Sequence, residues 1–292
     1  MTNMKIKIFL TLATVLICGS NIFAADEALF PGTKRNWKGF DDYNFKINVG
    51  EFGELYCRVV CPKDPAPGKP WIWRAVFFGH KPKAEIAMLN KGYYVAWIGC
   101  TDLVGSPQRV TQCNAFYKFI TEKGLSKKPC LLGMSRGGIC SMNWAIANPD
   151  CVSSIYIDNP VLDFKTWPGG FIKVGRSGSD WNSVMHSYKF KDEEEAKAYK
   201  GNPVDAFKPL AYRRIPILLM CGTGDKIVPY EYNGKLFFER YTAAGGPVTL
   251  VLKPGQDHRP HSLKNPKIIV DFFLNPPKTS SVSETTYQGN SG

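Results

Sequence analysis

Short apolar runs alternate with segments of helical spacing from residue 71 to residue 158, and this alternation restricts the fold more than any other feature of the chain. The runs have the length and the β-branched and aromatic content of strands, and the segments between them carry apolar residues at helical intervals. Such alternation predicts a mostly parallel sheet with helices on both faces. The predicted strands are 71–78, 93–99, 129–134 and 152–158, and the predicted helices are 83–92, 106–124 and 136–148.

The flanking segments extend this α/β class. Two alternating runs, 45–49 and 54–62, predict antiparallel strands that follow a loop rich in Gly, Trp and Lys. Beyond residue 214 the rhythm of strand and helix returns. The predicted strands there are 215–222 and 248–255, and the predicted helices are 230–246 and 266–275.

Two segments interrupt or end the rhythm. Residues 159–214 contain Gly and Pro clusters and short helical pieces, which predicts an insertion, or lid, over the sheet after the sixth strand. The tail 276–292 is polar and rich in Ser and Thr, which is typical of disorder. We expect one α/β domain over 25–275.

The first residues have the layout of a secretory signal peptide. Two lysines precede the apolar stretch 8–17, and small residues follow at Ala24 and Ala25. The stretch is too short for a membrane span, which needs about 20 apolar residues, and no later segment qualifies. The alternative is a buried helix. Cys18 raises the question of a lipid anchor, but the large Ile17 before it disfavours one, so we expect cleavage after Ala24 and a secreted or periplasmic protein.

Charge narrows the choice of partner. The chain of 292 residues has a net charge of +12, and removal of residues 1–24 leaves 35 basic against 25 acidic residues, a net charge of +10. A basic balance favours acidic partners such as polyanionic polysaccharide, nucleic acid or anionic membrane. The basic residues are scattered, without a long run or a nucleic-acid-binding motif, so we do not expect nucleic acid as a partner.

The eight cysteines after Cys18 are compatible with disulfides in an exported chain. Several of them lie in or at the ends of apolar runs, where free cysteine packs as a small hydrophobic residue. Cys57 and Cys61 are four residues apart on one predicted strand, too far for a bridge unless Cys61 leaves the strand. The pairing stays open. No C-x-x-C pair occurs, and no metal site is predicted.

The sequence Gly133-Met134-Ser135-Arg136-Gly137 joins a predicted strand to a predicted helix. A nucleophile for acyl transfer needs a sharp turn, small neighbours and a helix N-terminus behind it, and this G-x-S-x-G segment meets those needs. Taken alone, the pattern fits an ordinary tight turn equally well.

The groups that a serine nucleophile requires follow later in the chain. Asp225 comes just after strand 215–222, and His258 and His261 come just after strand 248–255. The carboxyl ends of parallel strands lie at one edge of a sheet, where such folds bind ligands. His261 is the second choice for the base. Asp158, at the end of strand 152–158, is a second candidate acid, or it caps the turn that follows.

Here the chain resembles the α/β-hydrolase superfamily over about 45–275, and in detail exported bacterial esterase-like members related to the catalytic domain of prolyl oligopeptidases. The matching motifs are "GTGDKIVP", which contains Asp225, and "PGQDH", which contains His258. The resemblance implies Ser135 as nucleophile, His258 as base and Asp225 as the acid that orients it. Members commonly have Gly before the catalytic His, where this chain has Asp257.

An oxyanion hole needs one N–H from the residue after the nucleophile, here Arg136, and one from the loop after strand 71–78, here Gly79 or His80. His80 is otherwise a filler beside the site. The "G-x-S-R-x-G" segment is similar to that of glucuronoyl esterases, which implies that the Arg136 side chain stabilises an oxyanion or a substrate carboxylate. The alternative is an arginine that points to solvent.

Trp167 and Trp181 lie in the insertion and are candidates for stacking on sugar rings, or else they anchor the insertion. Together these features predict an exported serine hydrolase that cleaves carboxylic esters of polysaccharides or oligosaccharides, with no metal or organic cofactor. Acetyl, methyl-uronate, glucuronoyl and feruloyl esters stay open. The alternatives are a peptidase of the prolyl oligopeptidase type and an inactive hydrolase-fold binding protein. The short stretch before the first strand leaves no room for the gating domain of those peptidases, which favours small or accessible esters.

Overall fold

A computed structural model of the chain describes residues 30–172 and 174–284. The predicted signal peptide 1–24, with Cys18 and the cleavage site at Ala24, lies outside the described residues. No helix in the described part is long and apolar enough to cross a membrane.

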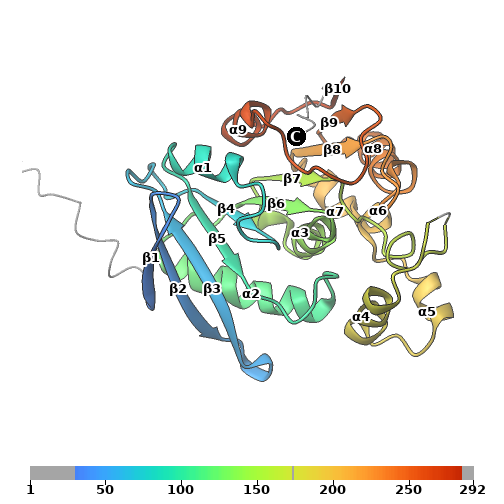
Figure 1. Cartoon of the computed structure of the whole chain (residues 1–292), viewed down its shortest axis with the longest axis horizontal. Helices are drawn as coiled ribbons and strands as arrows, with labels where there is room; N and C mark the ends of the chain where they lie inside the picture. The colour runs from blue at the N-terminus through green and yellow to red at the C-terminus, as the bar shows by residue number, and fades with distance from the viewer. Residues whose placement is uncertain (1–29, 173, 285–292) are drawn as a thin grey trace, which may run out of the picture.

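The described residues build one sheet of ten strands in the order β1-β2-β3-β5-β4-β6-β7-β8-β9-β10 (Figure 1). The pairs β1–β2, β2–β3 and β3–β5 are antiparallel, and all the other neighbours are parallel. This confirms the expected α/β-hydrolase sheet. The strands are β1 Thr33–Trp37, β2 Phe40–Asn48, β3 Glu54–Cys61, β4 Trp71–Arg74, β5 Tyr94–Ile98, β6 Cys130–Met134, β7 Ser154–Asp158, β8 Ile217–Gly222, β9 Val248–Lys253 and β10 Ser281–Glu284.

Helices cover both faces of the sheet. Helices α1 and α9 pack on one face around a cluster that includes Met88 and Ile269, and α2, α3 and α8 pack on the other (Figure 1). The α-helices are α1 Lys83–Leu89, α2 Pro107–Glu122, α3 Arg136–Ala147, α4 Gly178–Tyr188, α5 Glu193–Ala198, α6 Pro203–Ala206, α7 Lys208–Tyr212, α8 Gly234–Ala243 and α9 Lys267–Leu274, with 3-10 turns at Gly50–Phe52, Pro149–Cys151 and Tyr230–Tyr232.

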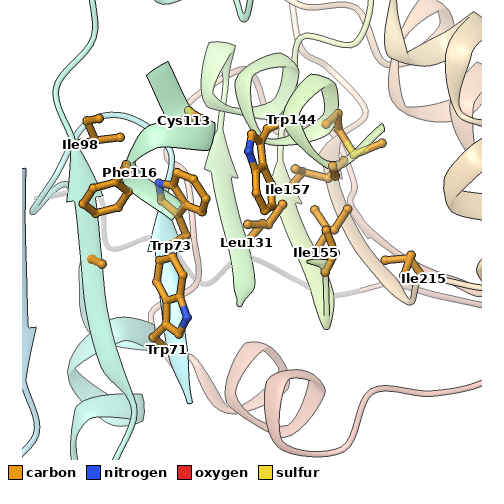
Figure 2. Close-up of a cluster of buried hydrophobic side chains, with 14 of the residues drawn as sticks. Trp71, Trp73, Ile98, Cys113, Phe116, Leu131, Trp144, Ile155, Ile157 and Ile215 are labelled. Carbon is orange, nitrogen blue, oxygen red and sulfur yellow. The ribbon is translucent and has the colours of Figure 1, made fainter. Parts of the chain in front are cut away.

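The core on the α2 and α3 side contains packed aromatic rings among aliphatic side chains (Figure 2). Trp73 of β4 lies 4.6 Å from Trp144 of α3 and 5.3 Å from Phe116 of α2, measured between ring centroids. Because the three residues come from a central strand and the two helices above it, their packing fixes α3 on the sheet. The start of α3 is where the candidate site lies.

Two predicted loops or tails are strands. The sequence predicts a loop before residue 45, but β2 already begins at Phe40, and β1 pairs with it through the turn Lys38–Gly39, where both residues have positive φ. The tail expected to be disordered from residue 276 instead pairs β10 in parallel with β9. Both strands are polar and lie at the sheet edges, so they lack the apolar pattern by which buried strands are found. With β1 included, the insertion follows the seventh strand rather than the sixth.

The strand predicted over 71–78 ends earlier, at Arg74. The following residues turn so that their carbonyl oxygens accept hydrogen bonds from the buried Arg74 side chain. Its guanidinium donates to the carbonyl oxygens of Val76, Phe77 and His80 and forms an ion pair of 2.6 Å with the buried Glu85. A buried charge is tolerated only when it is paired and hydrogen-bonded. The loop that follows β4 is therefore fixed in shape where it borders the candidate site.

Cys57 and Cys61 both remain on β3 and do not pair with each other. The thiols of six further cysteines in the described part of the chain are free: Cys100, Cys113, Cys130, Cys140, Cys151 and Cys221. Burial raises the pKa of the Cys113 and Cys130 thiols to about 11. These thiols are therefore protonated at neutral pH and act as small apolar side chains in the core.

Candidate active site

Ser135 occupies a strained turn between β6 and α3. Its backbone has φ 53° and ψ −122°, a conformation that L-residues rarely adopt and that marks functional sites. Glycines make the turn possible. A Cβ on Gly133 would lie 2.2 Å from the carbonyl oxygen of Gly137, and one on Gly138 would lie 2.3 Å from the Pro160 side chain. The turn is therefore built for close approach of backbone to backbone, as a nucleophile elbow requires.

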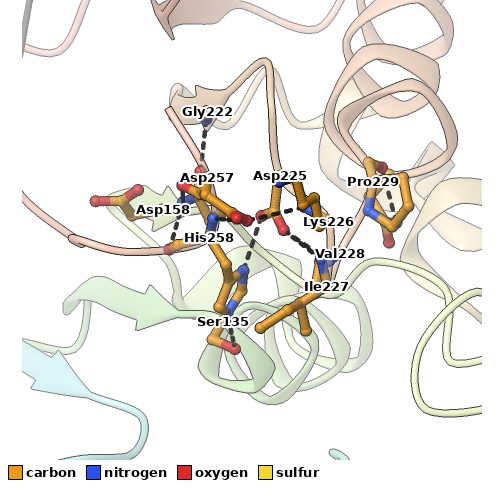
Figure 3. A network of polar contacts seen from close by, with 12 residues as sticks. Ser135, Asp158, Gly222, Asp225, Lys226, Ile227, Val228, Pro229, Asp257 and His258 are labelled. Atoms are coloured by element: carbon orange, nitrogen blue, oxygen red, sulfur yellow. Dashed lines mark hydrogen bonds and ion pairs between the residues drawn. The ribbon is translucent and has the colours of Figure 1, made fainter. Parts of the chain in front are cut away.

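The structure brings the side chains of Ser135, His258 and Asp225 into one hydrogen-bonded series (Figure 3). His258 Nε2 lies 2.9 Å from Ser135 Oγ, and His258 Nδ1 lies 2.7 Å from Asp225 Oδ2. Asp225 is fixed in turn, because its other oxygen accepts the N–H groups of Ile227 and Val228 at 2.9 and 2.8 Å. Within this series, Ser135 can lose a proton to an imidazole whose opposite nitrogen is held by a carboxylate.

Asp257, at a position where relatives commonly have glycine, accepts two backbone hydrogen bonds. Its Oδ1 accepts the N–H of Lys226 at 2.9 Å and that of His258 at 2.6 Å. These two backbone donors lower the pKa of the Asp257 carboxyl. Asp257 therefore ties the loop that carries Asp225 to the loop that carries His258.

His261, the second choice for the base, does not contact Ser135. Its ring is 6% exposed and meets the rings of His258 and His80 edge to face, with centroids 4.9 and 5.8 Å apart. Neither ring nitrogen has a hydrogen-bond partner among the described residues. Burial lowers the pKa of His261 from 6.5 to about 4. The Asp158 carboxylate opposes this shift, and His258, Lys253 and His80 add to it. His261 is therefore neutral at neutral pH.

This lowered pKa predicts acid sensitivity. The unfolded state takes up a proton at His261 near pH 6.5, but the folded state does so only near pH 4, so stability falls as the pH drops between these values. The His261→Phe variant is expected to lose roughly 3 kcal/mol less of its unfolding free energy than wild type between pH 7 and pH 4. Urea unfolding at both pH values measures this. An equal loss in both proteins contradicts the lowered pKa.

Asp158, the second candidate acid, pairs with Lys253 and not with His258. Its side chain is fully buried and forms an ion pair of 2.7 Å with Lys253 Nζ, accepts the Tyr156 hydroxyl at 3.0 Å and accepts the N–H of Ser262. The structure therefore places it neither as the partner of His258 nor as a simple turn cap. It links β7 to β9 and to the segment that carries His261.

Removal of one partner leaves a buried charge uncompensated. Lys253→Met is expected to lower the unfolding free energy by about 3–5 kcal/mol, and the double variant Lys253→Met/Asp158→Asn is expected to recover part of that loss. Urea titration of the three proteins measures both values. A loss under about 1 kcal/mol in the single variant contradicts the assignment of a charged buried pair.

The proposed oxyanion donors have different surroundings. The N–H of His80 donates to the carbonyl oxygen of Phe77 at 3.0 Å, so it is occupied within the turn and not directed at the site. This corrects the expectation for His80 as a backbone donor and leaves Gly79, which has φ 81°, as the candidate from this loop. Arg136 is the first residue of α3, where N–H groups are unpaired within the helix.

The Arg136 side chain does not extend freely into solvent. It donates to Asp180 Oδ1 at 2.7 Å, and its guanidinium lies 5.8 Å from the Phe77 ring centroid and 5.4 Å from that of Trp167. Asp180 belongs to α4 in the insertion. Arg136 therefore joins the elbow to the insertion, and its charge is balanced by Asp180.

The two tryptophans of the insertion, Trp167 and Trp181, have different surroundings. Trp181 is 3% exposed, packs edge to face on Phe171 and Phe164, and donates from Nε1 to Glu193. It anchors the insertion, so the expectation that it binds substrate is wrong. Trp167 lines the cavity beside Ser135.

The residues of the site surround one cavity of about 280 Å³. Three of its lining residues were not singled out from the sequence: Phe77, Ile227 and Arg259. Two of them could have been found from the sequence, because Ile227 lies two residues after Asp225 and Arg259 directly follows His258. The full lining is Phe77, His80, Ser135, Arg136, Trp167, Ile227, His258, Arg259 and His261. Within the described residues no group of three His, Cys, Asp or Glu side chains is arranged to hold a metal ion.

The mostly parallel sheet and the strained turn at Ser135 between β6 and α3 define an α/β-hydrolase. A sequence profile of the prolyl oligopeptidase family matches residues 108–275, so the chain belongs to that family, which is a family of serine hydrolases. No curated protein matches the chain.

Solved structures of low sequence identity share the fold. An acylaminoacyl peptidase of Pyrococcus horikoshii matches with a TM-score of 0.64 and 15% identity, over 83% of this chain and 42% of its own. A dipeptidyl aminopeptidase IV assigned as putative in Bacteroides ovatus matches at 0.61 and 14%, over 80% and 35%. Carboxyl esterase 2 of Tuber melanosporum matches at 0.55 and 17%, over 85% and 84%. The chain thus spans less than half the length of these two peptidases.

Proposed function

We propose that the chain is an exported serine hydrolase that cleaves carboxylic esters of carbohydrates. Ser135 is the nucleophile, His258 is the general base and acid, and Asp225 orients His258. The single observation that carries this proposal is the series of hydrogen bonds from Ser135 Oγ through His258 to Asp225, which opens on one cavity. The export step rests on the N-terminal sequence alone.

The proposed reaction has two halves. Ser135 Oγ attacks the ester carbonyl carbon while its proton moves to His258 Nε2, and the N–H groups of Arg136 and Gly79 hold the oxyanion. The tetrahedral intermediate then expels the alcohol, which takes the proton from His258. Water attacks the resulting acyl-enzyme, gives a proton to His258, and releases the acid as Ser135 Oγ recovers its proton.

Asp225 acts through His258. A carboxylate bound to Nδ1 requires the proton on that nitrogen, which leaves Nε2 as the acceptor that faces Ser135. The same carboxylate stabilises the imidazolium that forms in each half of the reaction. Its own backbone donors, Ile227 and Val228, hold it in place during that change.

A carbohydrate ester is supported by the lining of the cavity. Trp167 offers a ring face on which a sugar can stack, and the arginines and histidines around Ser135 suit hydroxyl or carboxylate groups. Acetyl, methyl-uronate, glucuronoyl and feruloyl esters all have the carbonyl that the mechanism needs. The Arg136 side chain, held by Asp180 over Trp167, is proposed to position substrate in this cavity.

A serine peptidase is the second candidate. The family match and the two peptidase structures favour it, and the same three residues serve peptide cleavage. A third alternative, an inactive binding protein of this fold, predicts no turnover of either substrate class.

The deciding experiment is a substrate panel. Acetyl, methyl-uronate, glucuronoyl and feruloyl esters and a set of peptides, including Pro-containing ones, are tested with wild type and with Ser135→Ala. We expect turnover of at least one ester that Ser135→Ala abolishes. Turnover that survives in Ser135→Ala contradicts the mechanism, and turnover confined to peptides contradicts the esterase assignment.

A further inference from the structure

The cavity has one arginine whose charge is unbalanced. Arg259 follows His258, is exposed and lines the cavity. No acidic side chain of the described residues forms an ion pair with it, whereas Arg136, the other arginine of the lining, is paired with Asp180 at 2.7 Å. Both arginines border Ser135, but only Arg259 has a guanidinium available for an anion from outside the protein.

The second feature of this cavity is a buried imidazole, that of His261, which has no hydrogen-bond partner in the described residues. His261 lines the same cavity, and neither its Nδ1 nor its Nε2 is hydrogen-bonded within residues 30–172 and 174–284. Leaving a buried donor or acceptor unpaired costs about 1–3 kcal/mol, so such groups in native proteins usually have a partner. A cavity-lining histidine with no protein partner is suited to a partner that arrives with the substrate.

The surroundings of these two residues are cationic. Burial and then the charges of Arg74, Lys81 and Arg259 lower the pKa of His80, the other histidine on this wall. Asp158 opposes them, but its charge is taken up by Lys253. Arg74 is likewise paired with Glu85, and the Asp225 carboxylate is turned to His258 Nδ1. Lys81 and Arg259 are therefore the cations near His80 that have no ion pair within the described residues. This wall of the cavity therefore favours a negative charge.

We propose that Arg259 and His261, with His80 beside them, form a subsite that binds a carboxylate carried by the substrate close to its scissile ester. The inference rests on the proposed function and narrows it to esters that carry a free carboxylate besides the scissile ester, such as an acetyl ester on a uronic acid. A guanidinium binds a carboxylate through two parallel N–H donors, and a neutral imidazole adds one more. The carboxylate would give both residues the partner that the protein itself does not provide.

Matched pairs of small esters test the subsite. On the acyl side the pair is 4-nitrophenyl hydrogen adipate and 4-nitrophenyl hexanoate, and on the alcohol side it is 4-acetoxybenzoate and 4-acetoxybenzamide. The readout is the ratio of kcat/KM for the anionic member to that for the neutral member, normalised to the rates of the same esters with hydroxide. Wild type is expected to favour the anionic member of at least one pair by about tenfold, the size of one charge-assisted hydrogen bond.

Variants assign the preference to residues. Arg259→Gln and His261→Phe are each expected to lower this ratio towards 1, and Arg259→Lys to keep part of it, because lysine retains the charge without the planar fork. The control is Lys264→Gln, which removes an exposed charge from the same segment but outside the cavity lining and is expected to keep the ratio. Thermal unfolding of each variant checks that it is folded.

The outcomes separate the subsite from the proposed function. A wild-type ratio near 1 in both pairs, or a preference that Arg259→Gln leaves intact, overturns the subsite while turnover of the neutral esters still supports the hydrolase. If wild type hydrolyses none of the four esters, the proposed function falls and the subsite with it.

Discussion

His258→Ala is expected to lower kcat for ester hydrolysis by about 10⁶-fold, because Ser135 then has no base and the leaving alcohol has no acid. His258 Nε2 lies 2.9 Å from Ser135 Oγ, and within the described residues the serine hydroxyl has no other base at hydrogen-bond distance. Steady-state kinetics with the best ester of the panel measure the loss, and near-ultraviolet circular dichroism checks the fold.

The matched control is the neighbouring histidine. His261→Ala removes an imidazole of the same cavity that does not touch Ser135, so its loss of kcat is expected to be at least 100-fold smaller than that of His258→Ala. If instead His261→Ala is inactive while His258→Ala still turns over, the base is wrongly assigned.

Asp225→Asn has the second largest expected effect, a loss of kcat of about 10⁴-fold. Asparagine keeps the size of the side chain, but its amide can donate to His258 Nδ1 and so favour the tautomer with the proton on Nε2, where it cannot accept the Ser135 proton. The imidazolium formed during the reaction also loses its counter-charge. Pre-steady-state measurement of alcohol release is the suitable assay, since it isolates the acylation step.

Asp257→Asn is the control for this carboxylate. Asp257 holds the backbone of His258 and of Lys226 but not the imidazole, so its replacement is expected to cost about tenfold or less. Comparable losses in Asp225→Asn and Asp257→Asn would mean that the ring is held by the loop and not by Asp225.

The sequence allowed much of the fold to be predicted, because buried parallel strands are continuous apolar runs and amphipathic helices have a period near 3.6. The strand β6, the elbow at Ser135 and helix α3 follow this rule. The loops that carry Asp225 and His258 were located because the carboxyl ends of parallel strands lie on one edge of the sheet.

The edge strands and the polar contacts could not be predicted in this way. Strand β1 is polar and almost fully exposed, so its pairing depends on the turn after Trp37 and not on burial. Lys253 and Asp158 are 95 residues apart in the sequence, and Arg74 and Glu85 lie on different elements, β4 and α1. No periodicity encodes which charge meets which.

The same limit applied to the arginines of the site. Arg136 is a candidate site residue by its place in the elbow motif, but its charge is balanced by Asp180, 44 residues further along the chain. Arg259 follows the motif that contains His258 but is not part of it, and only the cavity shows that it lines the same site as Ser135 and His261. Arg136 and Arg259 therefore differ in whether an acidic side chain of the described residues lies close in space, which local sequence patterns do not show.

Covalent labelling of Ser135 tests the central claim most directly. Wild type and Ser135→Ala are incubated with a fluorophosphonate probe, which reacts with an activated serine, and the intact mass and the modified peptide are determined by mass spectrometry. We expect one adduct per wild-type chain, located on Ser135, and none on Ser135→Ala. An unlabelled wild type, or equal labelling of Ser135→Ala, would contradict the assignment of Ser135 as the nucleophile.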